Sequence, residues 1–179
     1  MTVIFLIPFL LFPAILITII IKLTSRGPSL YWSERIGLNN IVFNMPKFRT
    51  MKLEAPEVAT HLLEAPDTFY TPCGSFLRRT SLDEIPQLYS ILINKMTLVG
   101  PRPALHNQED LIDLRNKIGV SKIKPGVTGW AQVNGRDDIS INHKVELDFE
   151  YMQRKSTLFD CLILWKTFLK VIKRHGVSH

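Results

Sequence analysis

The hydrophobic positions of this sequence begin with one long run near the N-terminus. Residues Val3 to Ile21 carry no charge, and Thr18 is their only polar residue. At about 1.5 Å per residue, a helix of this length reaches most of the way across a bilayer core of about 30 Å. Pro8 and Pro13 interrupt the run, and a proline near its middle bends a helix. The residues alone therefore favour a straight membrane span slightly over a re-entrant hairpin.

Basic residues follow this run directly, at Lys22 and Arg26. By the positive-inside rule, they predict that the rest of the chain lies in the cytoplasm, whether the run spans the membrane or only enters it. A secretory signal fits poorly, because only Met1 and Thr2 precede the run and no small-residue cleavage site follows it.

The next hydrophobic positions form two short β-prone runs, Leu30 to Ile36 and Ile41 to Met45. Between them, residues 37–40 include a glycine and asparagines that tolerate the left-handed conformation, so we predict a β-hairpin. Residues 52–72 then mix three prolines with acidic residues and show a clear period only around Val58 to Leu63. We expect a surface excursion there, with one short helix.

Helical spacing resumes with the apolar residues Leu88, Ile91 and Leu92. Pro86 fits the first turn of this helix, where its missing N–H costs nothing, and Asp83 is then at or near the N-cap. The alternative is a capping box of Ser81 and Glu84, which would waste a hydrogen bond at Pro86. Exposed amides and the helix dipole favour an ionised Asp83 and also attract a phosphate. This carboxylate is therefore a candidate nucleophile.

Several turns in the second half of the chain present basic residues. Arg102 lies between two prolines, a rigid mount that suits a phosphate-binding guanidinium and equally a plain structural turn. Glycine-rich turns are also predicted at residues 125–129 and at Asn134-Gly135-Arg136, each a weak signal by itself. Asn94 is the expected left-handed C-cap of the preceding helix.

The last hydrophobic pattern, from Leu158 to Arg174, is amphipathic with a helical period. One face carries Leu158, Leu162, Trp165, Leu169 and Ile172, and another carries Lys166, Lys170 and Lys173. We favour an ordinary helix packed on the core of the domain. The alternative is a helix that lies in a membrane interface.

Composition adds a class of ligand to this picture. The 179 residues suit one domain with a core large enough to fold without disulfides. A net charge of +6 together with 46% hydrophobic residues indicates an anionic membrane surface or phosphorylated ligands before nucleic acid. Aromatic residues are not interleaved with basic ones as a nucleic-acid platform requires. Cys73 and Cys161 form no C-x-x-C pair, so we expect two reduced thiols in a cytosolic compartment and no zinc site.

Three sequence blocks, in order, resemble signature blocks of the bacterial sugar transferases, the monotopic polyprenyl-phosphate phosphoglycosyl transferases. They are residues 76–88 (FLRRTSLDEIPQL), 96–103 (MTLVGPRP) and 125–136 (PGVTGWAQVNGR). Residues 47–51 (KFRTM) and the spacing of Asp148, Tyr151 and Asp160 also match this family. The resemblance runs from about Pro13 to the C-terminus.

The resemblance implies that a sugar-1-phosphate is transferred from a nucleoside diphosphate sugar, expected to be a UDP-sugar, to polyprenyl (undecaprenyl) phosphate. This would be the first membrane step of lipopolysaccharide or exopolysaccharide assembly. It implies a covalent phosphosugar on Asp83, with Glu84 as partner and Mg²⁺ as a cofactor held by these two carboxylates. The implied substrate-binding residues are Arg78, Arg102, Arg136, Lys47 and Arg49. The physical argument agrees, because an anionic nucleophile approaches an anionic diphosphate only when cations neutralise the repulsion.

The implied fold is α+β, a mostly helical small domain with a β-hairpin and interfacial amphipathic helices. Residues 1–24 would form a re-entrant membrane helix and residues 25–179 a catalytic domain on the cytoplasmic face of the bacterial inner membrane. The family breaks its helix at a Ser-Pro pair, which reverses the preference for a straight span. Here Pro13 is present, Phe12 takes the serine position, and the family's basic juxtamembrane start is missing. Membrane lipids and a second copy of the chain are further expected partners, and nucleic acid is not.

Two other functions stay open at this point. A membrane-anchored diphosphate hydrolase would use the same carboxylate, Mg²⁺ and arginines with water as the acceptor, and product analysis separates it from a transferase. A basic module that binds anionic lipid or a partner without catalysis is supported only by charge and amphipathicity. The residues do not identify the transferred sugar.

Overall fold

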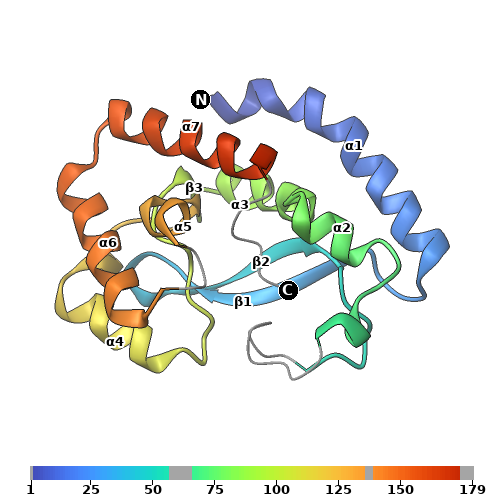
Figure 1. The fold of residues 1–179 in the computed structure, drawn as a ribbon, viewed down its shortest axis with the longest axis horizontal. Coiled ribbons are helices and arrows are strands. Elements are labelled where there is room, and N and C mark those ends of the chain that lie inside the picture. Colours follow the sequence, from blue (N-terminus) through green and yellow to red (C-terminus); the bar gives the residue numbers. More distant parts are fainter. Residues whose placement is uncertain (1, 57–65, 136–138, 174–179) are drawn as a thin grey trace. The chain divides into compact units, whose positions relative to one another are not determined.

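The structure is a computed structural model that describes residues 2–56, 66–135 and 139–173, with side chains described for residues 10–56, 67–135 and 139–172. It combines helices with short strands (Figure 1), which confirms the α+β prediction. The described residues fall into two compact units. The first unit contains residues up to 32 together with 46–89, and the second contains residues 33–45 and 90–173.

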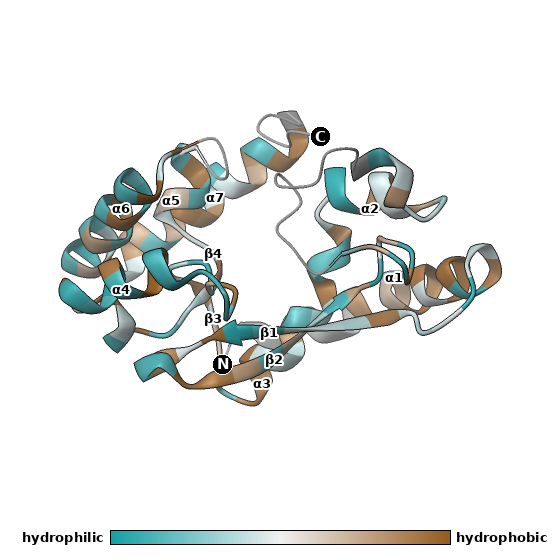
Figure 2. Cartoon of the chain, turned by 90° about the horizontal axis from the view of Figure 1, so that it is seen from below, coloured by the Kyte–Doolittle hydropathy of each residue, from teal (hydrophilic) through white to brown (hydrophobic). Residues whose placement is uncertain are grey.

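In the first unit, the apolar N-terminal run forms the helix α1 (Thr2–Thr24). Ile17 and Ile21 of α1 are buried against Phe48 and Leu77. Many other apolar side chains of its described part are exposed, namely Leu11, Phe12, Ile15, Leu16, Ile19, Ile20 and Leu23. Figure 2 shows this hydrophobic character along α1.

A bilayer crossing requires a helix that is both long and apolar, and none in the described part of the chain meets both conditions. The re-entrant arrangement of residues 1–24 stays a prediction.

The predicted hairpin is confirmed as a two-stranded sheet of β1 (Leu30–Ile36) and β2 (Val42–Phe48). Its tip is the 3₁₀ turn η1 (Leu38–Asn40), in which Asn39 and Asn40 have φ of 52° and 60°, as their left-handed tolerance predicts. The second strand continues past the predicted end at Met45. A two-stranded sheet accepts Pro46 because an edge strand need not pair every N–H.

The excursion after β2 is described only in part. Met51 pairs with Tyr70 through an isolated antiparallel bridge, and η3 (Pro66–Phe69) is a short 3₁₀ helix. The short helix predicted around Val58 to Leu63 lies outside the described residues. The chain then forms α2 (Gly74–Arg79), the 3₁₀ helix η4 (Leu82–Gln87) and α3 (Leu88–Leu92).

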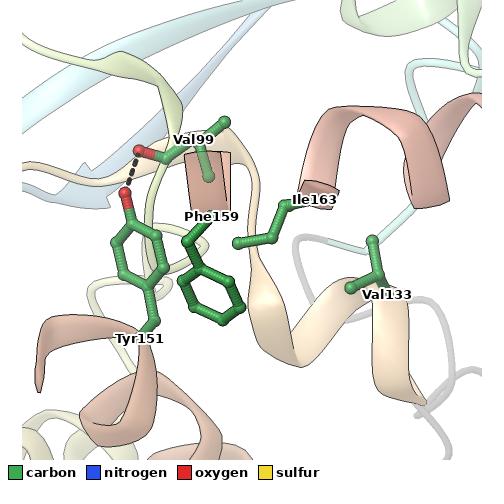
Figure 3. Packing of buried hydrophobic residues seen from close by; sticks show 5 residues of the cluster. All are labelled: Val99, Val133, Tyr151, Phe159 and Ile163. Atoms are coloured by element: carbon green, nitrogen blue, oxygen red, sulfur yellow. Dashed lines mark hydrogen bonds between the residues drawn. The ribbon is translucent and has the colours of Figure 1, made fainter. Parts of the chain in front are cut away.

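The second unit is built around the parallel strands β3 (Thr97–Val99) and β4 (Gly126–Thr128). Its helices are α4 (Glu109–Lys117), η5 (Val120–Lys122), α5 (Trp130–Asn134), α6 (Ile141–Arg154) and α7 (Thr157–Lys173). Figure 3 shows the apolar cluster of this unit in which Phe159 lies beside Tyr151 and Ile163. Asn94 has the predicted left-handed conformation with φ of 62°, and both cysteines are free thiols as predicted.

The prediction of a glycine-rich turn at residues 125–129 is wrong, because this segment contains strand β4. Its glycines permit close backbone packing. A Cβ on Gly126 would lie 2.1 Å from the Gly100 nitrogen, and one on Gly129 would lie 2.1 Å from the Gly100 carbonyl oxygen. Strand β4 therefore requires glycine where it meets the residues that follow β3.

Helix α7 packs on the core, as predicted, but not through the face that the sequence pattern marks as apolar. The residues buried in the core are Phe159 and Ile163. Most of the predicted apolar face is exposed instead, including Leu158, Leu162, Trp165 and Ile172. Two residues of the expected polar face contact the second unit instead. The Lys166 ammonium lies 4.6 Å from the Trp130 ring centroid, and Lys170 donates to the Gln132 carbonyl.

Candidate active site around Asp83 and Glu84

The two adjacent carboxylates lie in the first turn of η4. Ser81 is the N-cap with φ of 56°, and its side chain makes no capping hydrogen bond. The Glu84 amide instead donates to the Ser81 carbonyl oxygen at 3.2 Å, the i→i+3 pattern of a 3₁₀ helix. Asp83 is therefore near the N-cap, as predicted, but it is not the cap, and the side-chain capping box is absent at Ser81.

Pro86 is the fifth residue of η4 and not part of the first turn of a continuous α-helix, which corrects the sequence prediction. The α-helical turn begins only at Leu88. Because the proline lies in a 3₁₀ segment ahead of α3, no α-helical hydrogen bond is lost at its nitrogen.

Packing of η4 leaves both carboxylates with little exposure. Asp83 is buried, and the Glu84 side chain, which is 11% exposed, reaches a basic residue. Leu82 and Ile85, on either side of the pair, pack against the cluster that contains Ile21 of α1. The helix α1 thus helps to fix the segment that carries both carboxylates.

Lys47 is brought to this site by β2. Its Nζ donates to Glu84 Oε1 at 3.0 Å, and its side chain is 15% exposed. The low exposure of both partners limits screening by water, so this pair is stronger than a surface salt bridge. Two residues that the sequence assigned to the site are therefore in direct contact.

Arg78 is held by the segment that follows β2. Its Nε donates to Thr50 Oγ1 at 3.0 Å, and its guanidinium lies 5.5 Å from the Tyr70 ring centroid. Its Nη2 lies 3.7 Å from the Met51 sulfur. The half-buried guanidinium therefore has a defined orientation in the first unit.

Arg49 is 5% exposed and points to the end of α1. Its Nη1 donates to the Arg26 carbonyl at 2.6 Å, and its Nη2 donates to Ser25 Oγ at 2.7 Å. The guanidinium therefore joins β2 to the connection after α1. Its predicted contact with substrate stays a prediction.

Arg102 is half-buried in the second unit, in the loop after β3. The backbone around it is held by hydrogen bonds from several elements, and one of these comes from Arg115 to the Arg102 carbonyl at 2.9 Å. Arg136 lies outside the described residues, so its role stays a prediction.

Arg115 was not among the predicted site residues. Its Nε and Nη2 donate to Asp148 Oδ2 at 3.0 and 2.5 Å, inside the second unit. Burial raises the pKa of the Asp148 carboxyl, and the Arg115 charge opposes this rise. The sequence signal was available, because Arg115 follows Leu111 by four residues and thus lies on the buried face of α4.

The other two residues of the matched spacing also act inside this unit. The Tyr151 hydroxyl lies 3.0 Å from the Val99 carbonyl oxygen and 2.9 Å from Asp160 Oδ1. Burial, with the Asp160 carboxylate, raises the pKa of Tyr151, so the phenol stays protonated and can donate.

The carboxylates of Asp83 and Glu84 suit Mg²⁺, which prefers oxygen ligands. Among the described residues, no group of three or more histidine, cysteine, aspartate or glutamate side chains could hold a metal ion. Mg²⁺ commonly binds through one or two carboxylates and takes its other ligands from substrate phosphates and water. The residues present therefore fit a metal that binds together with a phosphorylated substrate.

Comparison with known proteins shows which sequences this chain is similar to. A family model described as "Bacterial sugar transferase" matches residues 1–174. The chain is 38% identical over 162 residues to the Escherichia coli UDP-glucose:undecaprenyl-phosphate glucose-1-phosphate transferase, covering 86% of this chain and 35% of that protein. It is 38% identical over 165 residues to the uncharacterized sugar transferase EpsL of Bacillus subtilis, covering 92% and 80%.

A third relative is the exopolysaccharide production protein ExoY of Rhizobium meliloti, which is 33% identical over 177 residues, covering 90% of this chain and 78% of that protein. The chain thus spans about a third of the length of some curated relatives and about four fifths of others.

Proposed function

The chain belongs to the bacterial sugar transferase family, and we propose that it transfers a sugar-1-phosphate from a nucleoside diphosphate sugar to polyprenyl phosphate. The observation that carries this proposal is the adjacent pair Asp83 and Glu84, with Lys47 bonded to Glu84 at 3.0 Å. The name of the Escherichia coli relative supports a UDP-sugar and undecaprenyl phosphate as the substrates.

In the first step, a carboxylate oxygen of Asp83 attacks the phosphorus that bears the sugar. A new O–P bond forms, the bridging P–O bond of the diphosphate breaks, and the nucleoside monophosphate leaves with the electron pair. In the second step, an oxygen of polyprenyl phosphate attacks the same phosphorus. The bond to Asp83 then breaks, which restores the carboxylate and forms the lipid diphosphate sugar.

The neighbouring residues then have separate roles. Side chains of adjacent helical residues point in different directions, so Asp83 and Glu84 do not attack as equals. Glu84 is oriented by Lys47, whose ammonium also offsets part of the negative charge next to the nucleophile. Arg78 and Arg102 supply guanidinium groups for phosphate oxygens.

Mg²⁺, held by the Asp83 and Glu84 carboxylates, would supply charge neutralisation for the diphosphate when bound. The polyprenyl acceptor requires access to a membrane. The exposed apolar side chains of α1, and separately those of α7, support attachment to a membrane, proposed to be the bacterial inner membrane. The basic residues Lys22 and Arg26 after the apolar run support a site on its cytoplasmic side.

The proposal is tested with membranes that contain the full chain, polyprenyl phosphate and a panel of UDP-sugars, by measuring UMP release. We expect one sugar to give UMP and a lipid-linked product. Without polyprenyl phosphate, the protein should gain the mass of one phosphosugar on the peptide that contains Asp83. An adduct on another peptide would show that the nucleophile is misassigned, and free sugar phosphate as the only product would indicate a hydrolase.

The Asp83→Asn variant tests the residue itself. A neutral amide is a far poorer attacking group than a carboxylate, so nearly all turnover should be lost. The melting temperature of the variant is measured as well, so that loss of the nucleophile is distinguished from loss of the fold. The matched control is Asp113→Asn, because Asp113 is exposed on α4 and should leave UMP release unchanged. Substantial activity in Asp83→Asn would refute the covalent step.

A further inference from the structure

We propose that Arg115 and Asp148 are positioning residues that hold the Arg102 loop in the geometry that binds the diphosphate of the nucleotide sugar. This inference rests on the proposed function, because it assigns Arg102 a substrate contact. The evidence for it is a set of hydrogen bonds inside the second unit. These bonds involve Asp148 and Tyr151, which match the family spacing but had no assigned function.

The loop from Val99 to Ala104 is held at five of its backbone carbonyls. The carbonyl of Val99 lies 3.0 Å from the Tyr151 hydroxyl, and that of Pro101 accepts from the Gly126 amide at 2.9 Å. The carbonyls at positions 102, 103 and 104 accept from Arg115 Nη1 at 2.9 Å, Arg35 Nη1 at 3.2 Å and the Ile36 amide at 3.0 Å. A loop without regular secondary structure is thus fixed from several sides.

Among these donors, Arg115 alone acts on the residue that carries the predicted phosphate contact. Its Nη1 binds the Arg102 carbonyl, while Nε and Nη2 bind Asp148 Oδ2. A planar guanidinium makes both contacts at once because its donors have a fixed fork geometry. Asp148 on α6 is 1% exposed, so its carboxylate has a fixed position and sets the direction of the Arg115 guanidinium.

A purely structural role explains this arrangement less well. A buried ion pair is often no more stabilising than an apolar pair of similar volume, because both charges lose their hydration. Burial raises the pKa of the Asp148 carboxyl, which agrees with a large desolvation penalty. The specific contribution of the pair is that Arg115 holds the Arg102 carbonyl in a fixed orientation.

The first variant combines Arg115→Met with Asp148→Leu and so removes both buried charges together. The second is Arg115→Lys, which keeps a positive charge beside Asp148 but has no fork to hold the Arg102 carbonyl as well. Two more variants complete a mutant cycle. They are Arg102→Ala alone, and Arg102→Ala combined with Arg115→Met and Asp148→Leu. The control is Arg154→Met, because Arg154 also pairs with a carboxylate in α6 and packs on Phe159.

For each full-length protein we measure the melting temperature, and the KM and kcat for the nucleotide sugar from UMP release. Arg102→Ala should raise KM by roughly tenfold or more, since it removes a hydrogen bond to a charged group. Both Arg115 variants should also raise KM, and in each of them kcat should change less than KM does. In the Arg102→Ala background, the Arg115 changes should have almost no further effect on KM. Arg154→Met should leave KM unchanged.

Additive effects on KM in the cycle would overturn the inference and leave the proposed function standing. The same holds if Arg115→Lys melts like the wild type and keeps its KM. If Arg102→Ala itself keeps the wild-type KM, the substrate contact of Arg102 fails and the inference fails with it. Should the double variant not fold, Arg115→Lys alone decides between these outcomes.

Discussion

Replacing Ile21 by alanine should test whether α1 is part of the fold that holds the carboxylate pair. Ile21 is completely buried and lies in one cluster with Phe48 and Leu77, and Leu82 and Ile85 of η4 pack against this cluster. The change removes about three carbon atoms, each worth roughly 0.8 kcal/mol of transfer free energy. With the cavity that remains, the free energy of unfolding should fall by about 2–5 kcal/mol.

Activity should fall with stability, because the cavity lies beside the η4 residues on either side of Asp83 and Glu84. We would measure thermal unfolding of the full chain in detergent by circular dichroism, and UMP release well below the melting temperature. The matched control is Leu23→Ala, on the same helix but 82% exposed, which should change the free energy of unfolding by no more than about 0.5 kcal/mol.

Equal melting temperatures for the two variants would refute the reasoning. Ile21 would then contribute no more to folding than an exposed residue, and α1 would act only as an attachment to the membrane. A loss of stability in Ile21→Ala with full kcat would instead separate the fold from the site, and would show that η4 keeps its geometry without this contact.

Other consequences follow from single ion pairs. Lys47→Met should reduce UMP release and lower the free energy of unfolding in urea by roughly 1–3 kcal/mol, because it leaves the poorly exposed Glu84 without this donor; an unchanged variant would contradict the contact. For Glu150, the Trp130 hydrogen bond and the Arg154 charge hold the pKa below its ordinary value. Its stabilisation is therefore present above about pH 4.5 and lost as the pH falls. Glu150→Gln should melt below the wild type at pH 7, with a gap that narrows toward acid, and a constant gap would contradict this assignment.

Local sequence signals predicted much of the fold. The hairpin followed from two β-prone runs around Asn39 and Asn40, whose left-handed backbone needs only short-range chemistry. The helical end at Asn94 followed for the same reason. These features depend on a few neighbouring residues, so the sequence contains the information that specifies them.

Features that depend on distant partners were missed. Two apolar stripes run along α7, and only the packing of Phe159 and Ile163 with Val99 and Val133 decides which one is buried. The 3₁₀ conformation around Asp83 likewise reflects the packing of η4, which no pattern of caps reveals. Arg115 carried a signal, a charged residue on a buried helix face, but its partner lies 33 residues away.

The site assignment turns on the difference between two buried aspartates, Asp83 and Asp148. A nucleophilic carboxylate has to keep a lone pair for the phosphorus and must exchange its partners when substrate arrives. Asp148 is unsuited to this, because Arg115 directs two donors to Oδ2 and the side chain is 1% exposed. Removing it would strand the Arg115 charge. Asp83 lies in a short 3₁₀ turn beside Glu84, in a motif that the family match covers. Burial alone does not separate the two residues. The pairing with Arg115 marks Asp148 as a structural carboxylate, and the family motif around Asp83 marks that residue as the candidate nucleophile.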